Sequence, residues 1–352
     1  MCSPPRLFSL RRSSSSVDHG LNATPLQDTS ARNFLLVPAN LICLVEDRSV
    51  TQMSQVIAFI NFKGGVGKTA NTVHIGTCLA ADHNKRVLIV DLDPQCNATF
   101  WLLPPKEWRS RIDDMTRSVC QVFHDQINGT KKFSFSKSVI KGVPISATGV
   151  GLNPKLDLLP ASVELIEVED ILHEQNKKPF FMFLRTALAP LRQEYDYILL
   201  DCPPNVFTVT KNALFFADSY VVPYIPDYLS LSGLNIFARR LRKFQQSVAA
   251  HDPRMRDPRI RAIIVNRFKS VGNVFSEAIV TLKGQLGELR KVQLVDPGAH
   301  ILSPYIRDCA GVAACSDEHL PVTLFKPDAI GAKDYQTLTS NFVYFFDRYE
   351  PK

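Results

Sequence analysis

The sequence Val56-Ile-Ala-Phe-Ile-Asn-Phe-Lys-Gly-Gly-Val-Gly-Lys-Thr69 joins a short apolar run to a glycine-rich turn that ends in Lys-Thr. An apolar run that stops abruptly at glycines is typical of a buried parallel strand, and residues 68–82 have the pattern of a helix. Glycines let the backbone wrap closely around phosphate oxygens, and the helix N-terminus adds a favourable dipole. Lys68 would reach the β- and γ-phosphates, and the Thr69 hydroxyl would bind Mg²⁺. We therefore predict a P-loop nucleotide-binding site, with contacts from Lys63, Gly64, Gly65, Val66, Gly67, Lys68, Thr69 and Ala70.

Strand-like and helix-like patterns alternate along the rest of the chain. Apolar runs predict strands at residues 86–91, 156–159, 197–201, 219–223 and 260–265, and helical periodicity predicts helices over 163–173, 180–194, 275–289 and 334–349. Residues 101–154 have no clear period, so we interpret them as an insertion or a variable helical segment with loops. The alternation predicts an α/β fold, with a doubly wound and mostly parallel sheet in a single domain.

The first 52 residues differ in composition from the rest, because they are rich in Arg and Ser and show no periodicity. Their basic and apolar parts lie far apart and no small-residue cleavage site is evident, which argues against a secretory signal peptide. An organellar transit peptide is one alternative. We expect instead a poorly ordered extension before a nucleotide-binding domain at residues 53–352, or sequence that precedes a true start at Met53.

Composition excludes several kinds of site and permits others. The chain has 352 residues, of which 45% are hydrophobic, and a formal net charge of +7. This charge permits contact with nucleic acid or an anionic membrane but does not prove either. The eight cysteines form no CxxC pair, so we expect no zinc site, redox dithiol or disulfide framework. No apolar run is long enough to span a bilayer.

Carboxylates stand at the ends of two predicted strands. Asp91 and Asp93 follow the run Val87-Leu-Ile-Val, and Asp201 ends the run Tyr197-Ile-Leu-Leu. The carboxyl ends of parallel strands share one edge of a sheet, where ligands bind in open α/β folds. Phosphoryl transfer needs a held Mg²⁺ and an oriented water, so these carboxylates are candidates for both tasks. The alternative is that each caps a turn.

Together these motifs resemble the ParA family of partitioning ATPases, in the ParA/MinD superfamily of SIMIBI-type P-loop proteins. A standard P-loop has glycine six residues before its lysine, whereas here Phe62 stands at that position and a second lysine, Lys63, opens the loop. This is similar to the superfamily's deviant Walker A motif. The similarity covers roughly residue 55 to the C-terminus, except 101–154. Other matching segments are Asp91-Leu-Asp-Pro-Gln-Cys-Asn-Ala-Thr99, Asp201-Cys-Pro-Pro204, Asn212-Ala-Leu214, residues 221–234 and residues 326–335.

The resemblance implies a role for each matching residue. Lys63 would cross a dimer interface to the partner's ATP and take part in catalysis with Lys68. Asp93 would position the attacking water. Asp91 would support Mg²⁺ or hold the loop, and Asn266 resembles a base-contacting position, although it could equally cap a turn. The implied Mg²⁺ ligands are Thr69, Asp91 and Asp201.

The resemblance also implies a functional cycle. ATP and Mg²⁺ would drive formation of a homodimer that binds DNA without sequence preference. A ParB-like or other cargo-adaptor protein would stimulate slow hydrolysis and release the dimer. The protein would thus segregate or position a plasmid, a chromosome or another cargo from a cytoplasmic, nucleoid-associated location, without stable membrane association.

A basic cluster lies between residues 239 and 261. Its members are Arg239, Arg240, Arg242, Lys243, Arg254, Arg256, Arg259 and Arg261, opposed by Asp252 and Asp257. Arg239, Arg242 and Lys243 have helical spacing and could follow phosphates along a duplex. A solvated helix face is the alternative. The resemblance adds Arg307, and the predicted DNA contacts are Arg239, Arg240, Arg242, Lys243 and Arg307.

Three other functions belong to related proteins. A MinD-like membrane ATPase would need a basic amphipathic C-terminal helix, and Leu338, Phe342 and Phe345 do share a helical face. Such a face is more often part of a core, and the following tail is neutral overall. An iron–sulfur role would need clustered cysteines, whereas only Cys309 and Cys315 are near one another. An operator-binding repressor would need an N-terminal helix-turn-helix pattern, which residues 1–52 do not show.

Overall fold

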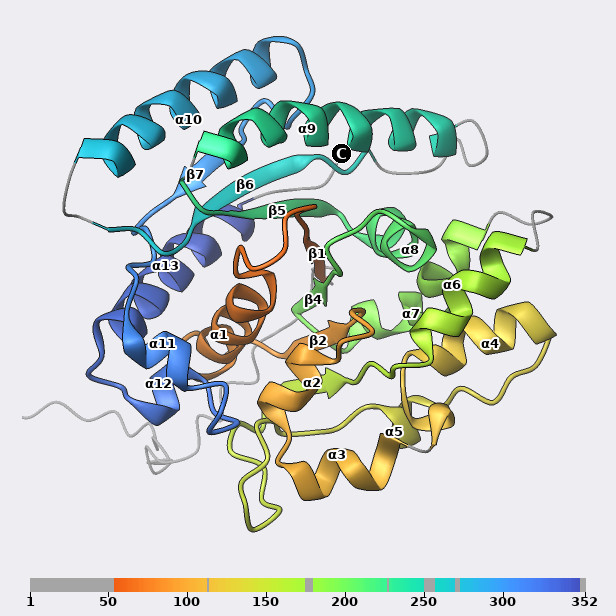
Figure 1. Ribbon diagram of the computed structural model, residues 1–352. Coiled ribbons are helices and arrows are strands. Elements are labelled where there is room, and N and C mark those ends of the chain that lie inside the picture. Colours follow the sequence, from red (N-terminus) through yellow and green to blue (C-terminus); the bar gives the residue numbers. More distant parts are fainter. Residues whose placement is uncertain are drawn as a thin grey trace, which may run out of the picture. The chain divides into compact units, whose positions relative to one another are not determined.

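Seven parallel strands form the sheet at the centre of the fold (Figure 1). The computed structural model describes residues 54–112, 114–174, 180–226, 228–249, 257–269 and 273–348. The predicted extension at 1–52 and the candidate start at Met53 lie outside these residues. The strands are β1 (Gln55–Phe59), β2 (Val87–Asp91), β3 (Leu156–Leu159), β4 (Tyr197–Asp201), β5 (Ser219–Tyr224), β6 (Ile260–Val265) and β7 (His300–Leu302).

The strand order is β3-β2-β4-β1-β5-β6-β7, and every neighbouring pair is parallel. The chain therefore builds the sheet outward in both directions from β1. In open parallel sheets, ligands bind outside the carboxyl ends of the strands where the order reverses. The loop that follows β1 lies at this position.

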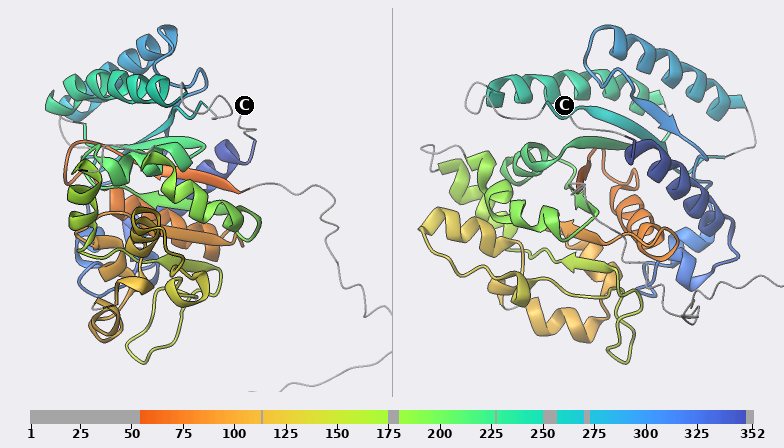
Figure 2. Two further views of the ribbon diagram at one scale, coloured as in Figure 1. Left: turned by 90° about the vertical axis from the view of Figure 1, so that its right-hand side faces the viewer. Right: turned by 180° about the vertical axis from the view of Figure 1, so that it is seen from behind.

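Helices cover both faces of the sheet (Figures 1 and 2). The helices of the first half are α1 (Lys68–Ala81), α2 (Asn97–Leu102), α3 (Pro105–Ile112), α4 (Cys120–Asn128), α5 (Phe135–Ser138), α6 (Leu165–Glu174) and α7 (Phe183–Leu188). Those of the second half are α8 (Thr208–Phe216), α9 (Tyr228–Ala249), α10 (Asn273–Lys291), α11 (Ala310–Ala314), α12 (Val322–Phe325) and α13 (Ile330–Phe346). Short 3-10 helices are η1 (Met115–Arg117), η2 (Phe180–Met182) and η3 (Ala189–Gln193).

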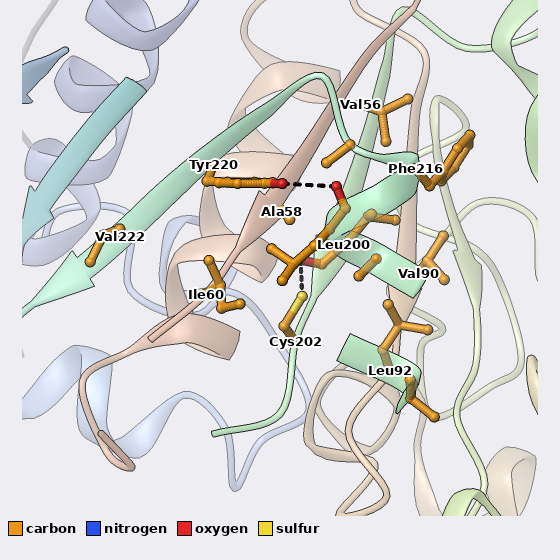
Figure 3. Close-up of a cluster of buried hydrophobic side chains, with 14 of the residues drawn as sticks. Val56, Ala58, Ile60, Val90, Leu92, Leu200, Cys202, Phe216, Tyr220 and Val222 are labelled. Carbon is orange, nitrogen blue, oxygen red and sulfur yellow. Dashed lines mark hydrogen bonds between the residues drawn. The ribbon is translucent and has the colours of Figure 1, made fainter. Parts of the chain in front are cut away.

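Each strand contributes side chains to two separate cores, because successive residues point to opposite faces of a sheet. On one face, Val56 and Ala58 of β1 pack with Leu200 and with Tyr220 (Figure 3). The Tyr220 hydroxyl donates a hydrogen bond of 2.9 Å to the Leu214 carbonyl, so its polar end is satisfied within this core.

The opposite face packs against α1 and α13. Phe59 of β1 stacks on Phe342 of α13, with ring centroids 6.4 Å apart. Leu79 of α1 and Leu338 of α13 are fully buried in the same cluster. Strands that are buried on both faces explain the nearly continuous apolar runs in the sequence.

The structure confirms the predicted doubly wound parallel sheet and changes some details. The helix predicted over 180–194 is divided into η2, α7 and η3, and Pro190 lies in the first turn of η3. Strand β7 has only three residues, which is too short to produce a recognisable pattern. Residues 101–154 contain the end of α2 and then α3, η1, α4 and α5, joined by loops.

Candidate functional site

The glycine-rich loop joins the end of β1 to the first residue of α1. Gly65 and Gly67 have φ angles of +71° and +91°, a region that side chains rarely adopt. At Gly67 a Cβ would also lie 2.9 Å from the amide nitrogen of Asn266. Glycine is therefore required here both by the backbone conformation and by the neighbouring side chain. The backbone turns directly into the N-terminus of α1, where free N–H groups favour phosphate oxygens.

Lys68 is the first residue of α1 and is 7% exposed. Its Nζ lies 3.5 Å from the Lys63 carbonyl oxygen, so the side chain folds back along the loop. Burial lowers the pKa of Lys68, while the charges of Asp201 and Asp93 oppose this effect. The structure thus brings together the lysine and two of the carboxylates that the sequence predicts for the site.

Asp201 ends β4 and is fully buried beside β1. Its Oδ1 accepts a hydrogen bond of 3.4 Å from Thr72, whereas its Oδ2 is buried without a hydrogen-bond partner in the described residues. Burial, followed by the charge of Asp91, raises the pKa of Asp201 well above its usual range, and a hydrogen bond from Thr69 works against this. An unpartnered carboxylate oxygen next to a threonine hydroxyl is a donor set that suits Mg²⁺. Thr69 and Asp201, two of the three side chains predicted to bind the metal, therefore fit it.

Asp91 ends β2 and pairs in register with Asp201. Its Oδ2 accepts hydrogen bonds from the backbone N–H (2.9 Å) and the hydroxyl (2.8 Å) of Thr99, and its Oδ1 accepts one from the N–H of Asp93 (3.2 Å). Burial raises the pKa of Asp91 to about 7, although these hydrogen bonds oppose the shift. Both oxygens are engaged by the loop, which favours the loop-holding role over the Mg²⁺ role that the sequence left open.

Asp93 lies in the loop between β2 and α2 and is 5% exposed. Its Oδ1 accepts a hydrogen bond of 2.9 Å from the N–H of Gln95. Burial raises the pKa of Asp93, and Lys68 partly offsets this. The carboxylate is thus held beside the lysine of the P-loop, as the proposed water-positioning role requires.

Two asparagines fix the P-loop to the neighbouring strands. The Asn266 Nδ2 donates to the Val66 carbonyl at 2.8 Å, and the Asn266 Oδ1 is buried without a partner in the described part of the chain. The Asn61 Nδ2 donates to the Pro223 carbonyl at 2.8 Å, and its Oδ1 accepts from the N–H of Lys63 at 3.0 Å. Asn266 therefore holds the loop, and contact with a base stays a prediction. Asn61 and Thr72 were not identified from sequence; the position of Asn61 just before the loop was an available signal.

The predicted DNA contacts do not share one environment. Arg239, Arg240 and Lys243 are exposed on α9, whereas Arg242 forms an ion pair with Asp257. The Arg307 guanidinium binds both carboxylate oxygens of the buried Asp334 and remains 42% exposed. Arg254 and Arg256 lie outside the described residues. Arg239, Arg240 and Lys243 are thus the basic side chains of α9 that remain available: they face solvent and form no described ion pair.

The C-terminal helix α13 and Cys315 both make contacts inside the protein. On α13, Leu338 and Phe342 are fully buried and Phe345 packs against the same core. This apolar face is used inside the protein rather than left for a membrane, and within the described residues no helix is long and apolar enough to cross one. The Cys315 Sγ lies 3.8 Å from the Nε2 of the buried His74.

A glycine loop joins a central parallel strand to a helix, and a buried lysine lies beside one carboxylate that ends β4 and another in the loop after β2. This arrangement defines a P-loop nucleotide-binding protein. A family model described as "AAA domain" (AAA_31) matches residues 54–252. The chain is 35% identical over 194 residues to the sporulation initiation inhibitor protein Soj of Bacillus subtilis, which covers 55% of this chain and 67% of that protein. It is 30% identical over 242 residues to the chromosome partitioning protein ParA of Myxococcus xanthus, which covers 68% of this chain and 74% of that protein. The chain belongs to the ParA family of partitioning ATPases.

A solved structure supports the fold assignment independently. Cobyrinic acid a,c-diamide synthase of Mycobacterium smegmatis, with bound ADP and magnesium, superposes with a TM-score of 0.61 at 23% identity. The match covers 85% of this chain and 98% of that chain. At this identity the likeness concerns the fold, and it confirms the P-loop architecture predicted from the sequence.

Proposed function

We propose that the protein is a Mg²⁺-dependent ATPase that forms an ATP-dependent homodimer, binds DNA without sequence preference and positions a cargo. The observation that carries this proposal is the buried Lys68 ammonium, which lies at the mouth of the glycine loop beside Asp93 and Asp201. The Mycobacterium smegmatis structure contains ADP and magnesium, and the Myxococcus xanthus relative is named as a chromosome partitioning protein. Both support a nucleotide-driven partition cycle.

Nucleotide binding follows from the geometry of the loop. Backbone N–H groups of residues 64–70 surround the phosphates, and Lys68 neutralises the charge that they bring. Thr69 and Asp201 would hold Mg²⁺, whose charge would offset that of the phosphates. The Asn266 Oδ1 has no hydrogen-bond partner in the described chain, and in this proposal it accepts from an adenine amino group.

Asp93 and Lys63 have separate roles in the proposed hydrolysis. Asp93 orients a water molecule for attack on the γ-phosphate, held for this task by its bond to Gln95. Lys63 lies in the loop with its backbone N–H bonded to Asn61, and its side chain reaches the nucleotide of the second subunit. Turnover therefore depends on dimer formation, and a ParB-like or other adaptor accelerates it.

The exposed face of α9 is the DNA-binding surface of the proposal. Arg239, Arg240 and Lys243 neutralise phosphates there, which gives strong salt dependence and no sequence preference. Phe62, which replaces the usual glycine of the loop, contacts Phe237 of α9 edge-on at 4.5 Å between centroids. Through this contact the nucleotide loop packs directly against the basic helix. DNA binding by that helix would place the protein on the nucleoid.

The test is binding of the purified protein to random-sequence duplex DNA, with ADP or ATP, across a salt series. Wild-type protein should bind only with ATP. The variant Lys243→Ala should lower the slope of log K against log salt by about 0.9, because one phosphate fewer is neutralised on binding. Lys106→Ala, an exposed lysine on α3 at the other end of the sheet in Figure 1, is the matched control and should behave as wild type.

The results of this assay test DNA binding and its control by nucleotide separately from ATP hydrolysis. Absence of DNA binding with either nucleotide would reject the DNA-binding step and leave ATP hydrolysis to be judged by its own assay. Equal binding with ADP and ATP would reject nucleotide control of the basic helix.

A further inference from the structure

A small pocket is lined in part by Cys96, which ends the loop that carries Asp93. Its walls come from α2, α3, η1 and the segment after β3. Helices α2 and α3 are neighbours in Figure 1. The lining residues that matter here are Cys96, Thr99, Trp108, Arg111, Arg117 and Ser162. The nucleotide site described above uses neither of the two arginines, nor the tryptophan, nor Ser162.

Two arginines line this pocket, and no described acidic side chain forms an ion pair with either. The Arg111 Nη1 is buried and makes no hydrogen bond within the described residues. Burial, followed by the nearby charge of Arg117, lowers the pKa of Arg111, and Glu107 only partly opposes this. Glu164, a second acidic neighbour, accepts the hydroxyl of Ser162 instead. An unpaired buried guanidinium nitrogen beside a second positive charge is costly unless an anion binds.

The size of the pocket limits what that anion can be. The cavity volume is about 20 Å³, which corresponds to one or two water-sized groups. This excludes a nucleotide. The pocket is partly open to solvent, so a small oxyanion can place one or two of its oxygens inside it. Guanidinium groups match tetrahedral oxyanions well, because each can donate two parallel hydrogen bonds.

We infer that this pocket is a second anion site, which binds one small oxyanion of the inorganic phosphate class between Arg111 and Arg117. The choice of phosphate rests on the proposed function, because ATP hydrolysis releases that ion. The site gives the segment at 101–154 a role in ligand binding.

The pocket is connected to the catalytic carboxylates through Thr99. The Thr99 hydroxyl accepts the N–H of Ala161 at 3.1 Å and donates to the Asp91 Oδ2, so the pocket wall and β2 share one hydrogen-bonded group. Asp91 in turn accepts the N–H of Asp93. Bound phosphate therefore stabilises the loop that holds Asp93, which would make the rate of turnover sensitive to the product.

The test is calorimetric titration of the full chain with potassium phosphate, at constant ionic strength and without nucleotide. Phosphate can also bind at the P-loop, so the measurement is made in the Lys68→Ala background. That variant should show saturable phosphate binding. Adding Arg111→Gln should weaken it by about tenfold or more, the loss expected for one charge-assisted hydrogen bond.

The matched control is Arg109→Gln on the same helix. Arg109 is exposed and lies over the Trp108 ring at 5.6 Å, outside the pocket lining, so phosphate affinity should not change. Circular dichroism verifies folding, and Arg117→Gln serves as a second pocket variant if Arg111→Gln unfolds the protein. The inference is overturned if the Lys68→Ala protein binds no phosphate, or if both pocket variants bind it as tightly as the control. Because no nucleotide is present, failure here is distinct from failure of ATPase or DNA-binding activity.

Discussion

Buried His74 should make the folded protein sensitive to mild acid. This residue lies on α1, the helix that begins at the P-loop, and is 0% exposed. The N–H of Val322 lies 3.4 Å from its Nδ1, and the rings of Trp101 and Tyr335 pack against it at 5.2 and 4.3 Å. Burial lowers the pKa of His74 from 6.5 to about 3, so the folded protein holds the neutral ring.

The sign and size of the effect follow from this shift. Below pH 6.5 the unfolded chain binds a proton at His74 that the folded chain does not bind, so stability falls as pH falls from 6.5 towards 3. At pH 5 the difference is about 1.5 pH units, which corresponds to about 2 kcal/mol of lost folding free energy. The nearby Cys315 and Tyr335 do not titrate in this range, because burial raises the pKa of both above their usual values.

Urea unfolding at pH 7 and pH 5 measures this loss, with His74→Gln as the comparison. The substitution removes the titrating group, so any constant cost of the glutamine cancels when each protein is compared with itself at the two pH values. Wild type should lose about 2 kcal/mol more than the variant between pH 7 and pH 5. An equal loss in both proteins would refute the assignment of a neutral, buried histidine.

Three further substitutions test the site and the scaffold. Asp93→Ala should still bind ATP and form the dimer but should lose hydrolysis, and normal phosphate release would contradict its water-positioning role. Lys63→Ala should retain nucleotide binding but lose the ATP-dependent dimer, as measured by light scattering coupled to size-exclusion chromatography; an intact dimer would argue against contact across the interface. Asp125→Ala should lower the unfolding free energy by about 2–4 kcal/mol, because its carboxylate accepts hydrogen bonds from Gln121, Thr130 and the N–H groups of residues 132 and 133. Chemical denaturation checks this value, and a change below about 1 kcal/mol would contradict the bracing role of Asp125.

The sequence alone predicted the central strands of the sheet and placed the candidate site residues at the carboxyl ends of those strands. A P-loop is a local structure: residues 56–69 contain the strand, the glycines, the lysine and the threonine within fourteen positions. Apolar runs that lead into Asp91 and Asp201 identified buried parallel strands, and parallel strands place their carboxyl ends at one edge. The structure confirms this sheet, with Asp91 and Asp201 in register.

Tertiary structure alone decided which charged groups are available and which are paired. Helical spacing grouped Arg242 with Arg239 and Lys243, but Arg242 pairs with Asp257, 15 residues further along the chain. Arg307 likewise pairs with Asp334, 27 residues away. No local pattern records such partners, because an ion pair depends on where two segments meet in space.

The contacts around the P-loop and the Arg111 pocket also depend on where distant segments meet in space, so the sequence did not predict them. Asn266 reaches the carbonyl of Val66 across 200 positions of sequence, and the Arg111 pocket combines residues from α2, α3, η1 and the segment after β3. The periodicity and spacing of residues along the chain determine strands, helices and turns, because those structures depend on near neighbours. Burial, unpaired charge and cavity size depend on how distant segments pack, so only the folded chain determines them.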